Sequence, residues 1–483
     1  MAHIPVRLTS IVATLGPSTS DETVLRRMID AGMDVARLNF AHGTHATHGD
    51  LLARLRRAAE ASGKFVAVLQ DLAGPKLRVL TRADQPVEVH AGDRILLCRD
   101  LQECEEPRAI ACTYPDIVDD CAPDDPVLFA DGDLVMRVAE RAEEHLVLDC
   151  ADDGTLRPGA GINLPQTDLG TSLPTEQDWR DLAWGLEHEV DYVGLSFVRT
   201  ADEVRCVKEH LAKAASNARV IAKIEKPQAV DAIEPILAEC DALMVARGDL
   251  GVEMDVARVP IIQKDLIHRA AAAGVPVITA TQMLQSMVNE PRPTRAEVSD
   301  VANAVFDGSD AVMLSGETAV GRHPVRAVEM MDHIIDLAED YAERADWQAP
   351  AARQERFVWS ERAIVAGATG IARNLDPAVI VALTHTGATA LLMSKQWLRV
   401  PILAVSDSVA TCRRMALYRG VMPVHSPDLI RQERLAAAVE RMARQRKLVV
   451  PGDRILIISG YFPGKPGGTD TLRVHTVSGG EAS

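Results

Sequence analysis

The sequence is poor in aromatic residues, which make up 4% of its 483 residues, whereas hydrophobic residues together make up 47%. The buried cores must therefore be mostly aliphatic and alanine-rich, as in an ordinary soluble α/β protein. At roughly 150 residues per domain, the length predicts about three domains. No apolar run approaches the roughly 20 residues of a membrane span. The N-terminal MAHIPVRLTS also lacks the apolar segment of an export signal, so we expect a cytoplasmic protein with no membrane partner.

The chain also lacks a surplus of basic residues and any paired cysteine motif. Its formal net charge is −17, which excludes a global basic field, so we expect no nucleic-acid partner. None of the eight cysteines forms a Cys-x-x-Cys pair with metal-site spacing, and we expect free thiols. An acidic protein can still bind anions where it concentrates cations in one cleft, so the position of each Lys and Arg is informative.

Short runs rich in Val, Ile and Leu alternate with amphipathic segments along most of the chain. The strand-like runs are 8–15, 35–41, 65–71, 191–198, 219–225, 242–248, 275–281 and 311–315, and helix-like segments between them include 22–31, 45–62, 201–215, 256–273 and 324–342. Near-continuous apolar strands linked by helices indicate a parallel sheet covered on both faces. Eight such units predict a (β/α)8 TIM barrel.

One crossover of this barrel is too long to be a simple loop. Segment 76–174 is strand-like and turn-rich, and we interpret it as a small β domain inserted after the third strand. An insertion there would lie over the barrel mouth as a lid. The barrel would then occupy 1–75 and 175–345. A new α/β pattern predicts a C-terminal domain over 355–483, with helices near 360–374, 387–396, 409–418 and 429–445 and strands at 378–383, 401–405 and 453–458.

Charged side chains follow the second and third strands, at the end of the barrel where working residues lie. Alternate residues of a strand share a face, so Arg37, Asn39 and Ala41 of RLNFAHG point together. A guanidinium and an amide there suit a phosphate, although an ion pair with a local carboxylate would also explain Arg37. The third strand continues into DLAGPKLR, whose charged residues lie at the hinge of the insertion: Asp71, Lys76 and Arg78.

Carboxylates follow the fifth and sixth strands. Lys223 and Glu225 point the same way, either as a structural ion pair or as a phosphate-facing ammonium beside a metal-binding carboxylate. Neighbouring strands can bring Glu225 and Asp249 onto one Mg²⁺, which is usually held by two carboxylates, substrate oxygens and water. Gly248 lets the backbone approach a ligand, and a short helix starting there could hold an anionic carboxylate. Hydroxyl and carboxyl groups end the last two strands: Thr281, Ser315 and Glu317.

Seven segments of the chain resemble those of pyruvate kinases, in that family's order: RLNFAHG, GPKLR, GINLP, AKIEKP, MVARGDLGVE, ATQMLQSM and PRPTRAEVSDVANAVFDGSDAVMLSGETAVG. The resemblance covers the barrel and the edges of the insertion, and it is looser in the C-terminal domain. It implies transfer of the phosphoryl group of phosphoenolpyruvate to ADP, which yields pyruvate and ATP in the last step of glycolysis. Such catalysis is mostly positioning and charge neutralisation.

The resemblance also implies a role for each site residue. Glu225 and Asp249 would ligate Mg²⁺, or Mn²⁺ in its place. The backbone amides of Gly248 and Asp249, with the Thr281 hydroxyl, would hold the phosphoenolpyruvate carboxylate. Arg37 and Lys223 would contact the phosphoryl group during its transfer. The remaining implied roles are nucleotide contacts from Asn39, His42 and Arg78, and proton delivery to enolpyruvate by Thr281 with bound water, Ser315 and Glu317.

The sequence departs from the family at its monovalent-cation site. Many pyruvate kinases need K⁺, held by an Asn, a Ser, an Asp and a Thr with a Glu nearby. Asn39 and Asp71 remain as a remnant of that site, but the Ser, Thr and Glu positions hold Ala41, Leu72 and Lys76. Replacing a carboxylate by an ammonium adds two units of positive charge. We therefore predict that K⁺ is not required and that Lys76 serves catalysis as an internal cation, unless Lys76 swings into solvent.

A second departure is Ala160, where the family often has a Lys that reaches nucleotide phosphates. In the C-terminal domain, hydroxyls and helix amides of THTGATA could cradle a phosphate. The resemblance implies an allosteric site there for a sugar phosphate or nucleotide, at Thr384, Thr386, Gly387, Thr389 and Lys465, although Ala388 replaces a common Arg. An ordinary capped helix and a mobile loop would be the alternative. The family is usually a homotetramer.

Two other functions stay open at this point. A different Mg²⁺-dependent barrel enzyme acting on phosphoenolpyruvate or a keto acid, such as a lyase, would keep Glu225 and Asp249 but would not need ADP. A catalytically silent metabolite sensor would be expected to lose Lys223 or a metal carboxylate, and both are present.

Overall fold

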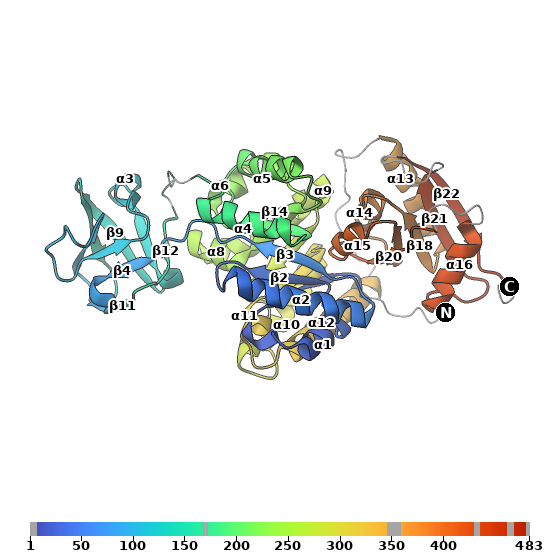
Figure 1. Cartoon of the computed structure of the whole chain (residues 1–483), viewed down its shortest axis with the longest axis horizontal. Coiled ribbons are helices and arrows are strands. Elements are labelled where there is room, and N and C mark those ends of the chain that lie inside the picture. Colours follow the sequence, from blue (N-terminus) through green and yellow to red (C-terminus); the bar gives the residue numbers. More distant parts are fainter. Residues whose placement is uncertain are drawn as a thin grey trace.

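The computed structural model of the chain describes residues 7–165, 167, 170, 172–344, 359–428, 435–460 and 468–479. Three bodies lie in a row (Figure 1): the inserted sheet domain at one end, a barrel in the centre and the C-terminal domain at the other end. Among the described residues, no helix has the length and apolar character that a membrane crossing needs. All eight cysteines are free thiols, as expected.

Eight parallel strands close into the predicted barrel, in the order β1-β17-β16-β15-β14-β13-β3-β2. They are β1 (Ser10–Leu15), β2 (Val35–Asn39), β3 (Ala67–Asp71), β13 (Tyr192–Leu195), β14 (Arg219–Ile224), β15 (Ala242–Ala246), β16 (Val277–Ala280) and β17 (Ala311–Leu314). Each lies within one of the eight predicted runs. Their residues are nearly all buried, because the strands pack on the barrel interior on one side and on helices on the other.

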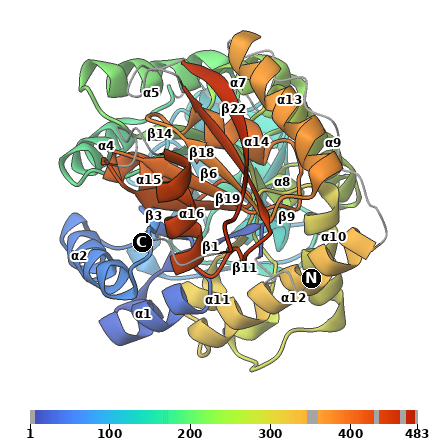
Figure 2. The same cartoon turned by 90° about the vertical axis from the view of Figure 1, so that its right-hand side faces the viewer.

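Helices surround this barrel as a ring (Figure 2). They are α1 (Glu22–Asp30), α2 (His45–Ser62), α4 (Glu176–Glu187), α5 (Ala201–Lys213), α6 (Pro227–Asp231), α7 (Ile233–Glu239), α8 (Arg247–Glu253), α9 (Val259–Ala273), α10 (Arg295–Asp307), α11 (Gly316–Ala319) and α12 (Pro324–Arg344). Segment 256–273, predicted as one helix, contains a separate 3-10 turn before α9 begins. Capping explains several boundaries: in α10, the Thr294 side chain accepts from the Glu297 amide and Gly308 ends the helix at φ 106°.

The insertion is a β structure with its own hydrophobic core. A seven-stranded sheet has the order β12-β8-β9-β10-β6-β7-β4, and β11 pairs with β5. The strands are β4 (Val79–Thr81), β5 (Val87–Val89), β6 (Arg94–Cys98), β7 (Ile110–Cys112), β8 (Pro126–Phe129), β9 (Leu134–Arg141), β10 (His145–Cys150), β11 (Gly154–Leu156) and β12 (Ile162–Asn163), with one short helix, α3 (Ile117–Asp120). A bridge between Arg78 and Gly161 holds the two connections to the barrel side by side.

The C-terminal domain contains a five-stranded sheet in the order β20-β19-β18-β21-β22, and only β22 is antiparallel. Its elements are α13 (Trp359–Leu375), β18 (Val379–Leu383), α14 (Ala388–Ser394), β19 (Ile402–Ser406), α15 (Val409–Met415), β20 (Val421–His425), α16 (Leu435–Gln445), β21 (Arg454–Gly460) and β22 (Thr469–Thr476). The sequence predicted neither β20 nor β22. Part of the predicted helix 429–445 precedes Leu435 and lies outside the described residues.

The C-terminal domain packs on the end of the barrel opposite the insertion (Figures 1 and 2). Residues of α14, α15 and β19 join the barrel interior in one hydrophobic cluster. A fully buried ion pair crosses this interface, because Lys395 Nζ lies 2.5 Å from Asp310 Oδ2. The inserted domain therefore lies over the other end of the barrel, the mouth, and the residues of the predicted site lie at that end.

Candidate active site

Asp71, at the end of β3, contacts two cations at the barrel mouth, Arg37 and Lys223. Arg37 Nε lies 2.5 Å from Asp71 Oδ2, and Lys223 Nζ lies 3.0 Å from Asp71 Oδ1. Lys223 Nζ also lies 2.8 Å from Glu225 Oε1. Burial alone would raise the Asp71 pKa, but the charges of Lys223 and Arg37 outweigh it and hold the pKa below its usual value. Both ion pairs considered from the sequence are therefore present, and the cations remain together at one site.

Lys223 is held from three sides. Besides Asp71 and Glu225, its Nζ donates to Ser196 Oγ at 2.6 Å, and Ser196 in turn donates to Leu72 O at 2.6 Å. Burial would lower the Lys223 pKa, but the neighbouring carboxylates reverse this and raise it above its usual value. The ammonium is thus fixed in place and stays charged. Ser196, which follows the fourth strand, was not singled out from the sequence because a lone serine after a strand carries little signal.

Glu225 and Asp249 are the residues suited to a divalent cation. Phe197 N donates to Glu225 Oε2 at 2.7 Å and orients the carboxylate. Burial raises the Glu225 pKa to about 7, opposed by Lys223 and reinforced by the charge of Asp249. A divalent cation between the two carboxylates would relieve this repulsion. Among the described residues there is no cluster of three or more His, Cys, Asp or Glu suited to a metal. Mg²⁺ sites commonly combine one or two carboxylates with substrate oxygens and water.

A short helix begins beside these carboxylates, as the sequence suggested. Helix α8 starts directly after β15 and carries Gly248 and Asp249 in its first turn. Gly248 N donates to Thr281 Oγ1 at 2.7 Å, so the amide and the hydroxyl assigned to the substrate carboxylate are in direct contact.

Thr281 has an unusual backbone conformation, with φ 69°. A β-branched residue is rarely found there, so the surrounding structure must hold it. Arg247 contributes, because its Nη2 donates to Thr281 O at 2.7 Å while its Nη1 donates to Asp300 Oδ1 at 2.7 Å. The sequence analysis did not single out Arg247, although a charged residue between a barrel strand and a helix was an available signal.

Glu317 and Ser315 lie at the end of β17. Glu317 is fully buried, and its carboxylate accepts from Leu284 N at 3.0 Å and from Ser315 N at 2.7 Å. It therefore joins the loop after β16 to α11. Ser315 Oγ is buried without a hydrogen-bond partner among the described residues.

The residues assigned to the nucleotide and the monovalent cation lie between β2 and the hinge. Asn39 Oδ1 accepts from Ala41 N at 3.1 Å. Lys76 Nζ donates to Ala41 O, and Arg78 Nη1 donates to Gly159 O at 3.3 Å. Burial lowers the His42 pKa, and the charges of Lys76, Arg78 and Arg37 lower it further. Positive charge is thus concentrated here in an otherwise acidic protein.

A cavity of about 670 Å³ opens beside Lys76, between the start of α2, the hinge and the start of α4. His45 lies in its wall, with Nε2 2.6 Å from Asp181 Oδ1. Gln177 also donates to Asp181 Oδ1, at 2.8 Å. None of these three residues was singled out from the sequence.

Comparison with known proteins agrees with this arrangement. The family model described as "Pyruvate kinase, barrel domain" matches residues 6–328, and "Pyruvate kinase, alpha/beta domain" matches 362–475. The chain belongs to the pyruvate kinase family. It is 39% identical to the pyruvate kinase of Geobacillus stearothermophilus, covering 98% of this chain and 81% of that protein. It is 42% identical to pyruvate kinase 2 of Synechocystis, with coverage of 98% and 79%.

Two further comparisons extend over nearly the whole of both chains. The pyruvate kinase of Dictyostelium discoideum is 37% identical, covering 97% of this chain and 94% of that one. A crystal structure of a pyruvate kinase from Cryptosporidium parvum matches with a TM-score of 0.89 and 31% identity, covering 98% of this chain and 96% of that one. The protein is thus a phosphotransferase, and its substrates are phosphoenolpyruvate and ADP. Pyruvate kinases generally depend on Mg²⁺.

Proposed function

We propose that this pyruvate kinase works without K⁺, with the Lys76 ammonium in place of the monovalent cation. The observation that supports this most is the hydrogen bond from Lys76 Nζ to Ala41 O. Ala41 and Lys76 occupy two of the positions at which the sequence departs from the family's K⁺ site. The ammonium is half-buried against the backbone there. Burial and the charge of Arg78 lower the Lys76 pKa, and the charges of Asp181 and Asp178 offset only part of this. The hydrogen bond to Ala41 O supports the internal position of Lys76 over the solvent-exposed alternative.

Lys223 and Arg37 would act on the phosphoryl group. Both contact Asp71, whose single negative charge balances only part of their positive charge. The positive charge gathered here would stabilise the charge that the phosphoryl group carries in the transition state, with little rearrangement of the protein. Arg37 Nη1 also donates to Thr14 Oγ1 at 3.0 Å, so Arg37 can present Nη2 to phosphoryl oxygens while its Nε stays on Asp71.

Glu225 and Asp249 would hold Mg²⁺, or Mn²⁺ in its place. The bound cation would supply a Lewis acid that neutralises phosphate charge. Gly248 N, Asp249 N and Thr281 Oγ1 would bind the phosphoenolpyruvate carboxylate, which would replace the existing contact between Gly248 N and Thr281 Oγ1. Thr281 with bound water, Ser315 and Glu317 would deliver the proton that converts enolpyruvate to pyruvate. Since Glu317 accepts two backbone amides, its contribution would be to position Ser315.

ADP would bind near Asn39, His42 and Arg78, under the inserted domain acting as a lid. His42 is exposed and Arg78 is partly exposed at the hinge, so both can approach phosphates when the domain moves. Ala160 supplies no charge at its position, so the phosphate contacts would depend on Arg78 and Lys76.

A phosphorylated metabolite would bind the C-terminal domain and regulate the enzyme. Thr384 Oγ1 accepts from Gly387 N at 2.9 Å, and Thr386 Oγ1 accepts from Ala388 N at 3.4 Å. Thr389 Oγ1 lies 2.7 Å from Thr469 Oγ1, which joins the start of α14 to β22. Lys465, the cation assigned to this site, lies outside the described residues. A homotetramer in the cytoplasm is the assembly and location that we propose for the enzyme.

The test is pyruvate formation from phosphoenolpyruvate and Mg²⁺, with and without ADP and KCl. We expect ADP-dependent activity that KCl changes less than twofold and that Glu225→Gln abolishes. Activity without ADP would instead indicate a lyase, and activity that appears only with KCl would contradict the role of Lys76. Binding of phosphoenolpyruvate without turnover under every condition would indicate a sensor.

A further inference from the structure

A buried ion pair joins the two chain segments that carry the carboxylates assigned to the metal. Lys226 follows Glu225 in the chain, and Glu253 lies one helical turn after Asp249 on α8. Lys226 Nζ is 2.8 Å from Glu253 Oε1, and the two side chains are only 8% and 0% exposed. The pair therefore joins the end of β14 to α8, the same two elements that carry Glu225 and Asp249.

The inserted domain rests on this pair through the segment Ile162–Leu164, called here the lid stem. Asn163 Nδ2 donates to Glu253 Oε1 at 3.3 Å, and Lys226 Nζ donates to Leu164 O at 3.4 Å. A second contact is nearby, because α8 also lies against the 3-10 turn Ala130–Gly132 of the inserted domain. Both members of the ion pair thus contact the lid stem, and α8 touches the inserted domain twice.

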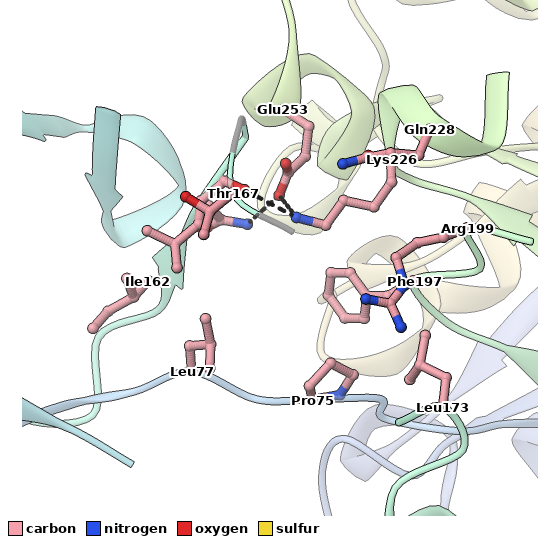
Figure 3. A pocket seen from close by; sticks show the side chains of 12 residues that line it. Pro75, Leu77, Ile162, Thr167, Leu173, Phe197, Arg199, Lys226, Gln228 and Glu253 are labelled. Carbon is pink, nitrogen blue, oxygen red and sulfur yellow. Dashed lines mark hydrogen bonds and ion pairs between the residues drawn. The ribbon is translucent and has the colours of Figure 1, made fainter. Parts of the chain in front are cut away.

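A cavity of about 40 Å³ separates the lid stem from the barrel at this point. In Figure 3, Lys226 and Glu253 point toward each other at the edge of this cavity, opposite Leu77 and Pro75 of the other hinge segment. The space is large enough for at least one water molecule. Glu253 Oε2 is buried and has no hydrogen-bond partner among the described residues. The hydrogen bonding of the pair is therefore incomplete, and it depends on where the lid stem lies.

We propose that Lys226 and Glu253 are positioning residues that hold Glu225 and Asp249 at the spacing a divalent cation needs. We further infer that docking of the lid stem on the pair steadies this spacing, so that lid position and metal binding are linked. The inference rests on the metal-binding role proposed above for Glu225 and Asp249. Groups that orient metal ligands commonly change affinity by about tenfold or more when they are removed.

The direction in which Lys226→Met changes metal affinity distinguishes a positioning role from a purely electrostatic one. Lys226 is a cation near a cation site, so as a charge alone it opposes metal binding, and Lys226→Met would strengthen that binding. As a positioning residue, Lys226 has the opposite effect, because Lys226→Met leaves Glu253 buried without its partner and frees α8 from β14. A double variant, Lys226→Met with Glu253→Gln, removes both charges together and should recover most of the loss.

The experiment is titration of the full-length protein with Mn²⁺ alone, with free Mn²⁺ measured by its electron paramagnetic resonance signal. We expect Lys226→Met to weaken binding by about tenfold and the double variant to lie within about threefold of wild type. Lys208→Met is the matched control, because Lys208 Nζ lies 3.7 Å from Asp241 Oδ1 in another ion pair. Asp241 precedes β15, away from the site. The Lys208→Met variant should bind Mn²⁺ as tightly as wild type. Binding by Lys226→Met that equals or exceeds wild type would overturn the proposal.

Glu225→Gln distinguishes this failure from failure of the proposed metal site. If Glu225→Gln leaves Mn²⁺ binding intact, the metal site itself is wrong. If Glu225→Gln abolishes binding while Lys226→Met does not weaken it, only the positioning role is wrong.

Hydrogen exchange tests the link to the lid. Backbone amides of residues 162–164 should exchange several-fold faster in Asn163→Ala and in Lys226→Met than in wild type or Lys208→Met. Asn163→Ala should also weaken Mn²⁺ binding by less than Lys226→Met does, because it leaves the ion pair in place. Exchange at 162–164 that is the same in all variants would show that the lid stem does not depend on the pair.

Discussion

Asp71 contacts both cations that we assign to the phosphoryl group, so Asp71→Asn is a direct perturbation of the site. The side chain is 1% exposed and contacts Arg37 and Lys223, themselves only 11% and 10% exposed. Removing one partner of a buried ion pair costs about 3–5 kcal/mol, because the remaining charge has no compensation. In a domain of this size, a loss of 1 kcal/mol in unfolding free energy lowers the melting temperature by about 2–4 °C. The melting temperature of Asp71→Asn should therefore fall on the order of 10 °C.

The same substitution should also lower kcat, because Lys223 and Arg37 lose the group that places them. A loss of about 10²-fold would match the removal of one preorganised contact to transition-state charge. Thermal melting and steady-state kinetics on the same preparations would measure the two effects. Asp191→Asn is the matched control, because Asp191 is also a buried carboxylate, with Oδ1 2.8 Å from Arg413 Nε at the opposite end of the barrel. The control should lose stability but keep its kcat, whereas an Asp71→Asn enzyme with wild-type stability and kcat would refute the reasoning.

Three further predictions concern other contacts. Arg247→Met should raise the KM for phosphoenolpyruvate by about tenfold, because one charged hydrogen bond to Thr281 O is worth about 1.5–3 kcal/mol; an unchanged KM in steady-state assays would contradict this. Lys395→Met should destabilise the interface with the C-terminal domain by about 3–5 kcal/mol, seen as a lower melting temperature, and Lys395→Met with Asp310→Asn should recover part of it. Ser478, His475 and Arg444 hold the pKa of Glu440 at about 2 despite burial. Because this pKa is depressed, the stabilisation is complete above the usual pKa of about 4.5 and is lost as pH falls toward 2. The melting difference between wild type and Glu440→Gln should therefore shrink between these pH values, and a constant difference would argue against it.

The barrel could be predicted because its strands are buried on both faces and appear as continuous apolar runs. Strands β20 and β22 could not be predicted in the same way. They form the two edges of the C-terminal sheet, and most of their residues are partly or fully exposed. Their sequences, VMPVH and TDTLRVHT, therefore lack a continuous apolar run and, in β20, contain a proline.

The strand-end residues of the candidate site could be predicted from the sequence, but their contacts could not. Strand-end residues such as Arg37, Lys223 and Glu225 follow from the barrel alone, because all parallel strands end at one face. Which carboxylate pairs with which cation depends on side-chain positions across neighbouring strands, and periodicity does not contain that information. Lys226 illustrates the limit. It stands one residue beyond a predicted ligand, yet its partner Glu253 lies 27 residues away in sequence.

The central claim is that the Lys76 ammonium replaces K⁺, and Lys76→Glu tests it most directly. This substitution restores a carboxylate at the position where the family has one. The measurement is the rate of pyruvate formation from phosphoenolpyruvate, ADP and Mg²⁺, with and without KCl, for wild type and Lys76→Glu in parallel. The account predicts a wild-type rate that KCl barely changes and a Lys76→Glu rate that is low without KCl and rises with it. A Lys76→Glu enzyme as active as wild type in the absence of KCl would contradict the account.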